Sequence, residues 1–87
     1  MDEEETSDEE LRSRALKMCA AYFDSGKIGG YAAVTVAEEL GVDLAEAVRI
    51  LRNLDRRGLV DFTRAGDVSQ SIVTRVTPAG LDLADRS

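Results

Sequence analysis

The sequence predicts a small α+β domain in which three helices precede a β-hairpin and one short helix follows it. Apolar residues recur at helical spacing up to residue 57, and after Gly58 the pattern changes to the alternation typical of β-strands. The chain has 87 residues, of which 44% are hydrophobic, so it can bury one modest core. We therefore expect a single domain over residues 8–87.

Charge is distributed unevenly along the chain. The formal net charge is −6, but seven of the acidic residues fall within residues 2–10, where there is no base. The remaining residues hold 10 acidic and 11 basic side chains, so the body of the protein is nearly neutral. Residues 1–7 form a charge run with almost nothing to bury, which predicts an acidic, disordered tail.

The composition excludes several functional classes. The chain has one cysteine, Cys19, and no histidine, which rules out a disulfide framework, a Cys/His zinc site and His-dependent catalysis. No pattern positions a nucleophile, so we expect neither an enzyme nor a cofactor. The chain has no apolar run of about 20 residues and no basic leader, which predicts a cytoplasmic protein without a membrane span.

Capping patterns divide the first half of the chain into helices. Ser7 and Glu10 form a capping box, which predicts a helix over about residues 8–25, followed by a glycine-containing loop and a short β-prone stretch at residues 31–34. Thr35 and Glu38 form a second capping box before a short helix that ends at Gly41.

Asp43 is expected to cap a longer helix that ends at Arg57, before Gly58. A short and a longer helix joined by a tight turn with glycine are typical of a helix-turn-helix. Two β-prone segments follow at residues 59–63 and 71–76, joined by a polar tip at residues 64–70. Pro78 then begins a short helix that reaches Ala84.

This order predicts a winged helix-turn-helix with a three-helix core, a two-stranded β wing and a short C-terminal helix. Residues 35–43 and 51–60 resemble the turn and recognition helix of MarR-like and related bacterial and archaeal transcription regulators. Residues 76–81 are similar to the segment with threonine, proline and glycine that follows the wing in that superfamily. The resemblance implies double-stranded DNA as the partner and insertion of the third helix into the major groove.

The third helix separates an apolar side from a basic side. Helical spacing places Arg49, Arg52 and Arg56 on one stripe, opposite an apolar group formed by Leu44, Ala47, Ile50, Leu51 and Leu54. The planar fork of arginine can bond guanine or hold a phosphate. The candidate DNA-binding residues are Thr35, Leu44, Ala45, Glu46, Arg49, Arg52, Asn53, Arg56 and, at the wing tip, Arg64.

The resemblance implies that the first two turns approach the base edges and that Arg52, Asn53 and Arg56 lie nearer the DNA backbone. The residues nearest the bases would be Leu44, Ala45, Glu46, Val48 and Arg49. Asn53 is also a candidate for bidentate binding of adenine. The chain departs from the family pattern at Leu44, Ala45 and Glu46, where family members often place serine, threonine or glutamine.

Two functional hypotheses stay open. The first is a DNA-binding transcription regulator that forms a homodimer through its first or last helix, with Tyr22 or Phe23 exposed there. The second is a winged-helix module that binds a protein partner without DNA contact, which the near-neutral body, the acidic tail and the departure at residues 44–46 favour. The arginines themselves have a structural alternative, a solvated helix face with pairs such as Glu46–Arg49 or Arg52–Asp55. A DNA reader requires a continuous positive face that Asp43, Glu46 and Asp67 do not interrupt.

Overall fold

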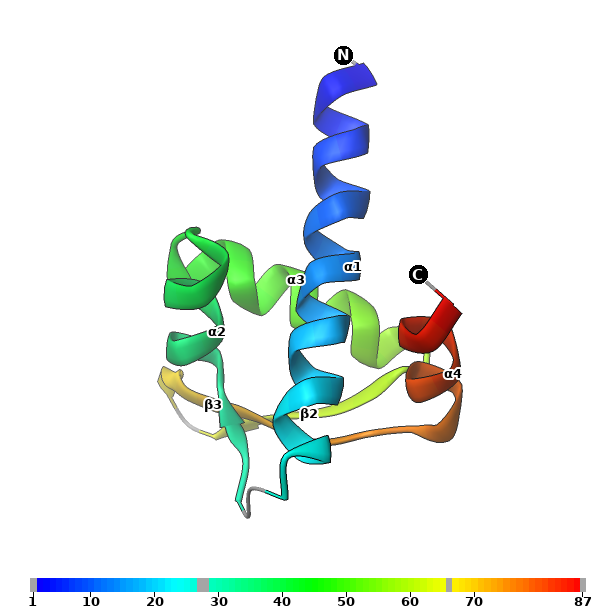
Figure 1. Ribbon diagram of the computed structural model, residues 1–87. Helices are drawn as coiled ribbons and strands as arrows, with labels where there is room; N and C mark the ends of the chain where they lie inside the picture. The colour runs from blue at the N-terminus through cyan, green and yellow to red at the C-terminus, as the bar shows by residue number, and fades with distance from the viewer. Residues whose placement is uncertain (1, 27–28, 66, 87) are drawn as a thin grey trace.

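The computed structural model describes the backbone of residues 2–26, 29–65 and 67–86, and it describes the side chains within these ranges except those of residues 2–8, 65 and 67–69. Within these ranges, four helices and three strands follow one another, and Figure 1 shows how they are arranged. They are α1 (Asp2–Asp24), β1 (Tyr31–Ala32), α2 (Ala33–Leu40), α3 (Leu44–Arg56), β2 (Val60–Ala65), β3 (Asp67–Val76) and α4 (Pro78–Arg86).

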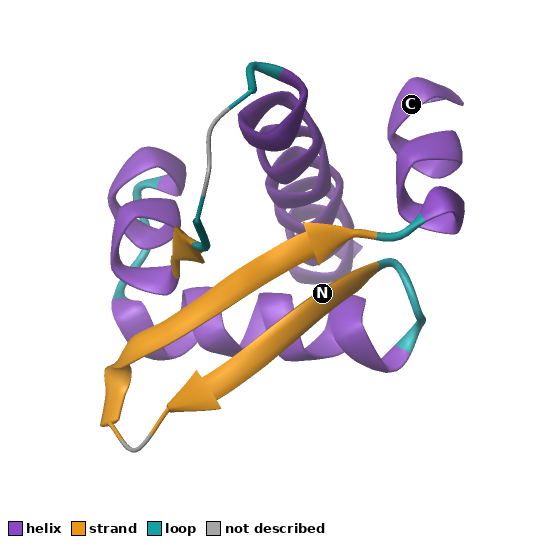
Figure 2. Cartoon of the chain, turned by 90° about the horizontal axis from the view of Figure 1, so that it is seen from below, coloured by secondary structure: helices purple, strands orange, loops and turns teal. Residues whose placement is uncertain are grey.

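The sheet has three antiparallel strands in the order β1-β3-β2. The β2–β3 hairpin runs beside α3, and the short β1 lies against the other edge of β3 (Figure 2). The expected two-stranded wing is therefore present, but a third strand, β1, extends its sheet. Tyr31 pairs with Val73 and Ala32 with Ile72, because the loop after α1 returns the chain to the free edge of the hairpin.

The core lies where the helices meet the sheet. Cys19 of α1, Val36 of α2, Leu51 of α3 and Val73 of β3 are each 0% exposed. Burial raises the pKa of the Cys19 thiol to about 12, which is typical of a small core side chain and not of a reactive thiol. Among the described residues, no helix combines the length and apolar character that a membrane span requires.

An aromatic group closes the core beside the loop after α1. Tyr22 stacks on Tyr31 with the ring centroids 4.2 Å apart, and Phe23 meets the edge of Tyr22 at 5.0 Å. The Tyr31 hydroxyl donates to Glu39, and burial together with this hydrogen bond raises the pKa of Tyr31 above its usual range. Tyr22 and Phe23 are half-buried against the core, so the expectation that one of them is exposed for dimerisation is wrong.

Two helices begin earlier than their capping boxes predict. The backbone of α1 is helical from Asp2, so Ser7 lies within the helix and not before it. Acidic residues near the amino end favour this extension because they complement the helix dipole. The expected division between a disordered tail at residues 1–7 and a domain from residue 8 stays a prediction for the tail's behaviour in solution.

The start of α2 is also set by packing and not by a capping side chain. Ala32 is the extended residue before α2 and makes no side-chain cap, so Thr35 lies in the first turn and does not cap it. Tyr31 and Ala33 are both buried, at 4% and 0% exposure, which requires the chain to pass directly from β1 into α2. The β-prone stretch accordingly ends at Ala32 and not at residue 34.

The hairpin arms are longer than expected, since β2 and β3 extend through most of the predicted tip.

Thr77 joins α4 to the end of α3. Its Oγ1 donates to the Gly58 carbonyl at 2.6 Å and accepts from the Gly80 N–H at 3.1 Å, while its own N–H donates to the Leu59 carbonyl at 3.0 Å. We call these three hydrogen bonds the Thr77 clamp.

Gly80 completes this junction because it has no side chain. A Cβ atom there would lie 2.0 Å from the Leu59 carbonyl oxygen, a backbone atom that cannot rotate away. The replacement Gly80→Ala should therefore lower the free energy of unfolding by about 2–3 kcal/mol in urea titrations. The neighbouring exposed change Ala79→Ser should stay within about 0.5 kcal/mol of the parent protein. Equal stability of the two variants would show that α4 does not pack as described.

Candidate nucleic-acid interface

A tight turn fixes the direction of α3 relative to α2. Gly41 adopts a left-handed conformation with φ 77°, and the N–H groups of Gly41 and Val42 both donate to the Ala37 carbonyl at 3.0 Å. Asp43 caps α3, because its Oδ1 accepts from the Glu46 N–H at 2.9 Å. Both features agree with the positions that the sequence indicates for the turn.

Helix α3 has one buried side and one exposed side. Ala47, Ile50, Leu51 and Leu54 are at most 2% exposed, whereas Arg49, Arg52 and Arg56 lie on the solvent side. Leu44 is half-buried against the core and does not join the fully enclosed group. Val48, expected among the residues that face DNA, is only 8% exposed.

Arg49 is paired along its own helix. Its Nη2 lies 2.7 Å from Glu46 Oε2, and its Nε donates to Glu46 Oε1 at 3.1 Å. Glu46–Arg49 is one of the two pairs within α3 that the sequence suggested. Within the described part of the chain, no ion pair or hydrogen bond is found for the side chains of Arg52, Arg56 or Arg64, so the other pair, Arg52–Asp55, does not form.

The wing brings a further arginine to α3. Arg52, Asp55 and Arg56 of α3 line one hollow with Phe62 and Arg64 of β2. We call Arg52, Arg56 and Arg64 the arginine cluster. The sequence suggested each of these arginines separately, but their meeting depends on how the hairpin packs beside α3, and no local pattern indicated that Phe62 and Asp55 would share the site.

A second hollow lies along the exposed face of α3 and is lined by Ala45, Val48, Arg49, Arg52, Asn53 and Arg56. The Oδ1 atom of Asn53 is enclosed there without a hydrogen-bond partner. A bidentate contact with adenine needs both polar atoms of the amide to be accessible, and Asn53 does not offer both in this conformation. Thr35 is exposed on α2 and lines neither hollow.

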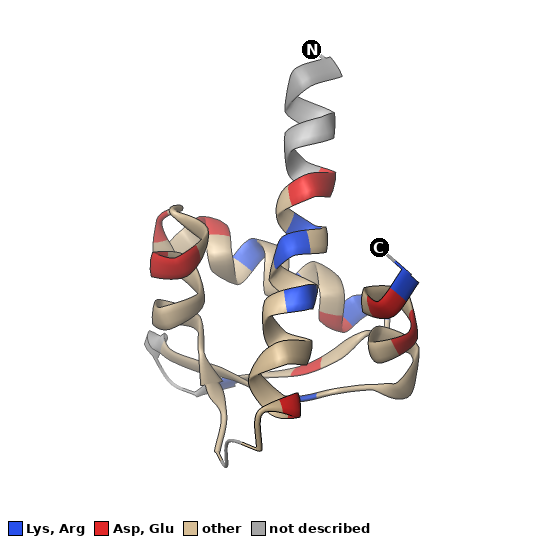
Figure 3. Cartoon of the chain, in the orientation of Figure 1, with Lys and Arg blue, Asp and Glu red and all other residues tan. Residues whose placement is uncertain are grey.

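Three acidic residues on or near α3 and the hairpin already have partners. Asp43 accepts the cap hydrogen bond and Glu46 pairs with Arg49, while on the hairpin Asp61 pairs with Arg75. The side chain of Asp67 lies outside the described residues. Acidic segments are concentrated around α2 and the start of α3, and basic segments occur farther along α3 (Figure 3). Arg52, Arg56 and Arg64 thus share a face that also contains the carboxylate of Asp55.

No protein-family model matches the sequence, and no curated protein is significantly similar to it. Solved structures of other proteins, in contrast, are similar to this chain in their fold. MepR, a transcription regulator of the Staphylococcus aureus multidrug efflux pump MepA, superposes with a TM-score of 0.69 and 18% identity over 87% of this chain and 52% of its own. The S. aureus MepR–DNA complex gives 0.66 and 20% identity over 87% and 58%. For the zinc-responsive MarR family member ZitR of Lactococcus lactis, the values are 0.63 and 19% over 86% and 47%.

The protein has the winged-helix fold of MarR-family regulators. This confirms the α+β class and the winged helix-turn-helix expected from the sequence. The winged-helix domain spans about half the length of the MepR and ZitR chains that it matches.

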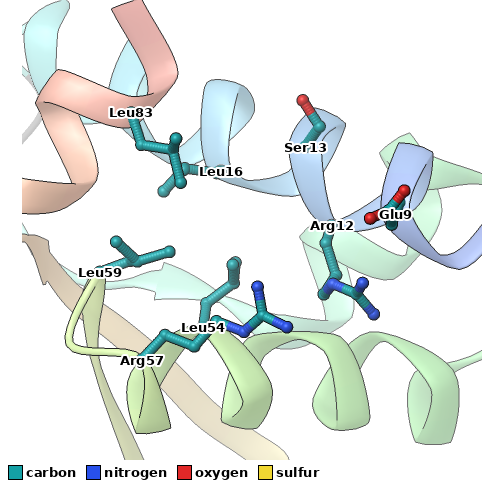
Figure 4. Close-up of a pocket in the computed structure, with 8 residues that line it drawn as sticks. All are labelled: Glu9, Arg12, Ser13, Leu16, Leu54, Arg57, Leu59 and Leu83. Carbon is teal, nitrogen blue, oxygen red and sulfur yellow. The ribbon is translucent and has the colours of Figure 1, made fainter. Parts of the chain in front are cut away.

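The winged-helix domain carries a further hollow, of about 250 Å³, between α1, the end of α3 and α4 (Figure 4). Leu16, Leu59 and Leu83 converge at one end of it, and Arg12 and Arg57 lie toward the other. Leu83 is 41% exposed, so this hollow continues into the outer surface of α4. It is separate from the two hollows on the exposed face of α3.

Removal of the α3 cap provides a test of the interface geometry. Asp43→Ala should lower the free energy of unfolding of the winged-helix domain by about 1 kcal/mol, because the Glu46 N–H loses its acceptor. Asp43→Ser retains an acceptor and should recover most of this loss. Urea unfolding followed by circular dichroism measures both variants, and an alanine variant as stable as the serine variant would refute the cap.

Proposed function

We propose that the protein is a transcription regulator that binds double-stranded DNA and inserts α3 into the major groove. The observation that carries this proposal is the arginine cluster, in which two side chains of α3 and one of β2 surround a single solvent-facing hollow. Guanidinium groups bind phosphate oxygens in a forked, charge-assisted geometry, so three of them side by side suit the DNA backbone.

The dimensions of the two elements fit a duplex. With 13 residues, α3 is about 20 Å long and can lie in a major groove about 12 Å wide. Arg64 on the adjacent hairpin then reaches the neighbouring backbone or minor groove. Arg56 holds a phosphate beside the groove, while Ala45, Arg49 and Arg52 approach the bases.

The similar structures support a regulator and not an enzyme. MepR and ZitR are described as transcription regulators or members of a regulator family, and MepR has been solved in complex with DNA. At 18–20% identity this similarity establishes the fold, so the binding of DNA by this chain rests on its own arginines.

The alternative of a protein-binding module requires an apolar patch on the exposed face of α3. The large hydrophobic side chains found exposed among the described residues are Val34, Leu81 and Leu83, and none of them belongs to α3. The exposed face of α3 carries arginines instead, which favours DNA as its partner.

We further propose that the protein acts as a homodimer through the outer surface of α1 and α4. Leu81 and Leu83 of α4 are 47% and 41% exposed, and Ala20 and Ala21 of α1 line a hollow with Leu81. Burial of this surface against a second copy would remove its apolar side chains from water. A dimer would read two half-sites about one helical turn apart.

Salt dependence of DNA binding tests the arginine cluster. Binding of a fluorescent random-sequence duplex should weaken as salt increases, and the change Arg56→Gln or Arg64→Gln should each reduce the slope of log affinity against log salt by about 0.9, the contribution of one phosphate contact. Fluorescence anisotropy between about 50 and 200 mM salt measures the slope.

The matched control is Arg14→Gln, which removes the same charge from an exposed position on α1. It should leave the slope unchanged. Equal effects of Arg14→Gln and Arg56→Gln would mean that only net charge matters. An absence of binding at any salt would refute the proposal and direct attention to a protein partner for the same helix face.

Sedimentation equilibrium tests the dimer. The intact protein should sediment as a dimer at micromolar concentrations, and the double change of Leu81→Ser and Leu83→Ser should shift it to the monomer by removing the apolar surface of α4. Val34→Ser, at an exposed apolar position on α2, should leave the dimer intact. A monomeric parent protein at about 100 μM would contradict the proposal.

A further inference from the structure

The exposed face of α3 offers an unusual means of distinguishing bases. Ala45 and Val48 lie one turn apart on the helix, and they form the apolar part of the hollow that Arg49 and Arg52 border. Ala45 is exposed, and Val48 retains 8% of its surface accessible. The hollow measures about 310 Å³, which leaves room for a group from outside to rest on the two apolar side chains.

From these contacts we propose that the preferred DNA half-site contains a thymine whose C5-methyl group rests on Ala45 and Val48, next to a guanine bound by Arg52. The inference rests on the proposed DNA-binding function and specifies what α3 reads. Among the four bases, thymine alone presents a methyl group in the major groove, and alanine is one of the side chains that contact it.

Few polar groups in the first turn of α3 are available to distinguish bases by hydrogen bonds, so the apolar contact is the means of discrimination there. Ala45 has no hydrogen-bonding group, and Asn53 keeps its Oδ1 enclosed. Glu46 is held by Arg49 at 2.7 Å, which turns its carboxylate along the helix toward that arginine. Hydrogen-bonded readout by the first turn is therefore limited, whereas removal of a methyl group from water requires only the exposed apolar surface that Ala45 provides.

Arg52 lies in the correct place to read the adjacent base. It lines both the hollow that contains Ala45 and Val48 and the hollow of the arginine cluster. Its guanidinium has no ion pair within the described part of the chain, so it is available to donate two hydrogen bonds to O6 and N7 of guanine. The flat face of the same guanidinium packs against the thymine methyl, so the two bases are recognised as one step of the duplex.

Replacement of thymine by uracil tests the proposal with a single methyl group. A preferred duplex is first selected from a random pool with the intact protein. Each thymine of the selected sequence is then replaced by uracil, which keeps base pairing and O4 and lacks only the methyl group. One such replacement in a half-site should weaken binding by about fourfold, the value of one buried methyl or methylene group.

Ala45→Ser assigns the effect to the hollow. This variant should still bind the selected duplex but should lose the difference between thymine and uracil at that position. Ala79→Ser, at an exposed position of α4, serves as the matched control and should keep the difference.

Equal binding of every uracil duplex would overturn the methyl contact while the DNA-binding function stands. A difference that persists in Ala45→Ser would overturn the assignment to this hollow. If the intact protein bound no duplex at all, the proposed function would fail first and this inference with it, so the two failures are distinguishable.

Discussion

Burial of one side of α3 is the constraint on which the exposed interface depends. Ile50 and Leu51 are 1% and 0% exposed and pack among side chains from α1, α2 and the sheet, which fixes the rotation of α3 about its own axis. Three arginines at helical spacing then face solvent because they occupy the remaining angles. The Asp43 cap and the turn at Gly41 set where the helix begins and how it leaves α2. The direction and the rotation of the helix are thus determined by separate groups.

Features encoded by neighbouring residues were predictable from the sequence. The Asp43 cap, the end of α2 at Gly41 and the separation of the apolar from the basic side of α3 all follow from spacing within a few residues. Features set by distant partners were not. The pairing of β1 with β3, the early start of α2 and the proximity of Arg64 to Arg56 depend on packing between segments that are at least eight residues apart.

The capping boxes at Ser7 and Thr35 show the same distinction. Each has the residues of a helix start, yet neither begins its helix. A cap contributes about 1 kcal/mol, which is less than the free energy of burying side chains such as Tyr31 and Ala33 on both sides of the α2 junction. At Asp43 no buried segment competes with the cap, and the local pattern holds. Thr35, a candidate inferred from resemblance, lines neither hollow of the exposed face of α3. Val48, another such candidate, lies beside Arg52 and Arg56 but is largely buried.

The Thr77 clamp connects α4, which we propose for dimerisation, to the end of α3, which we propose for DNA binding. Through Gly58 and Leu59 it ties the first turn of α4 to the residues that directly follow α3, and Gly80 leaves no space for the junction to slide. Three hydrogen bonds and a close backbone approach therefore hold the start of α4 against the segment that follows α3. In the dimer that we propose, the distance between the two α3 helices would then depend on how the two α4 helices contact each other.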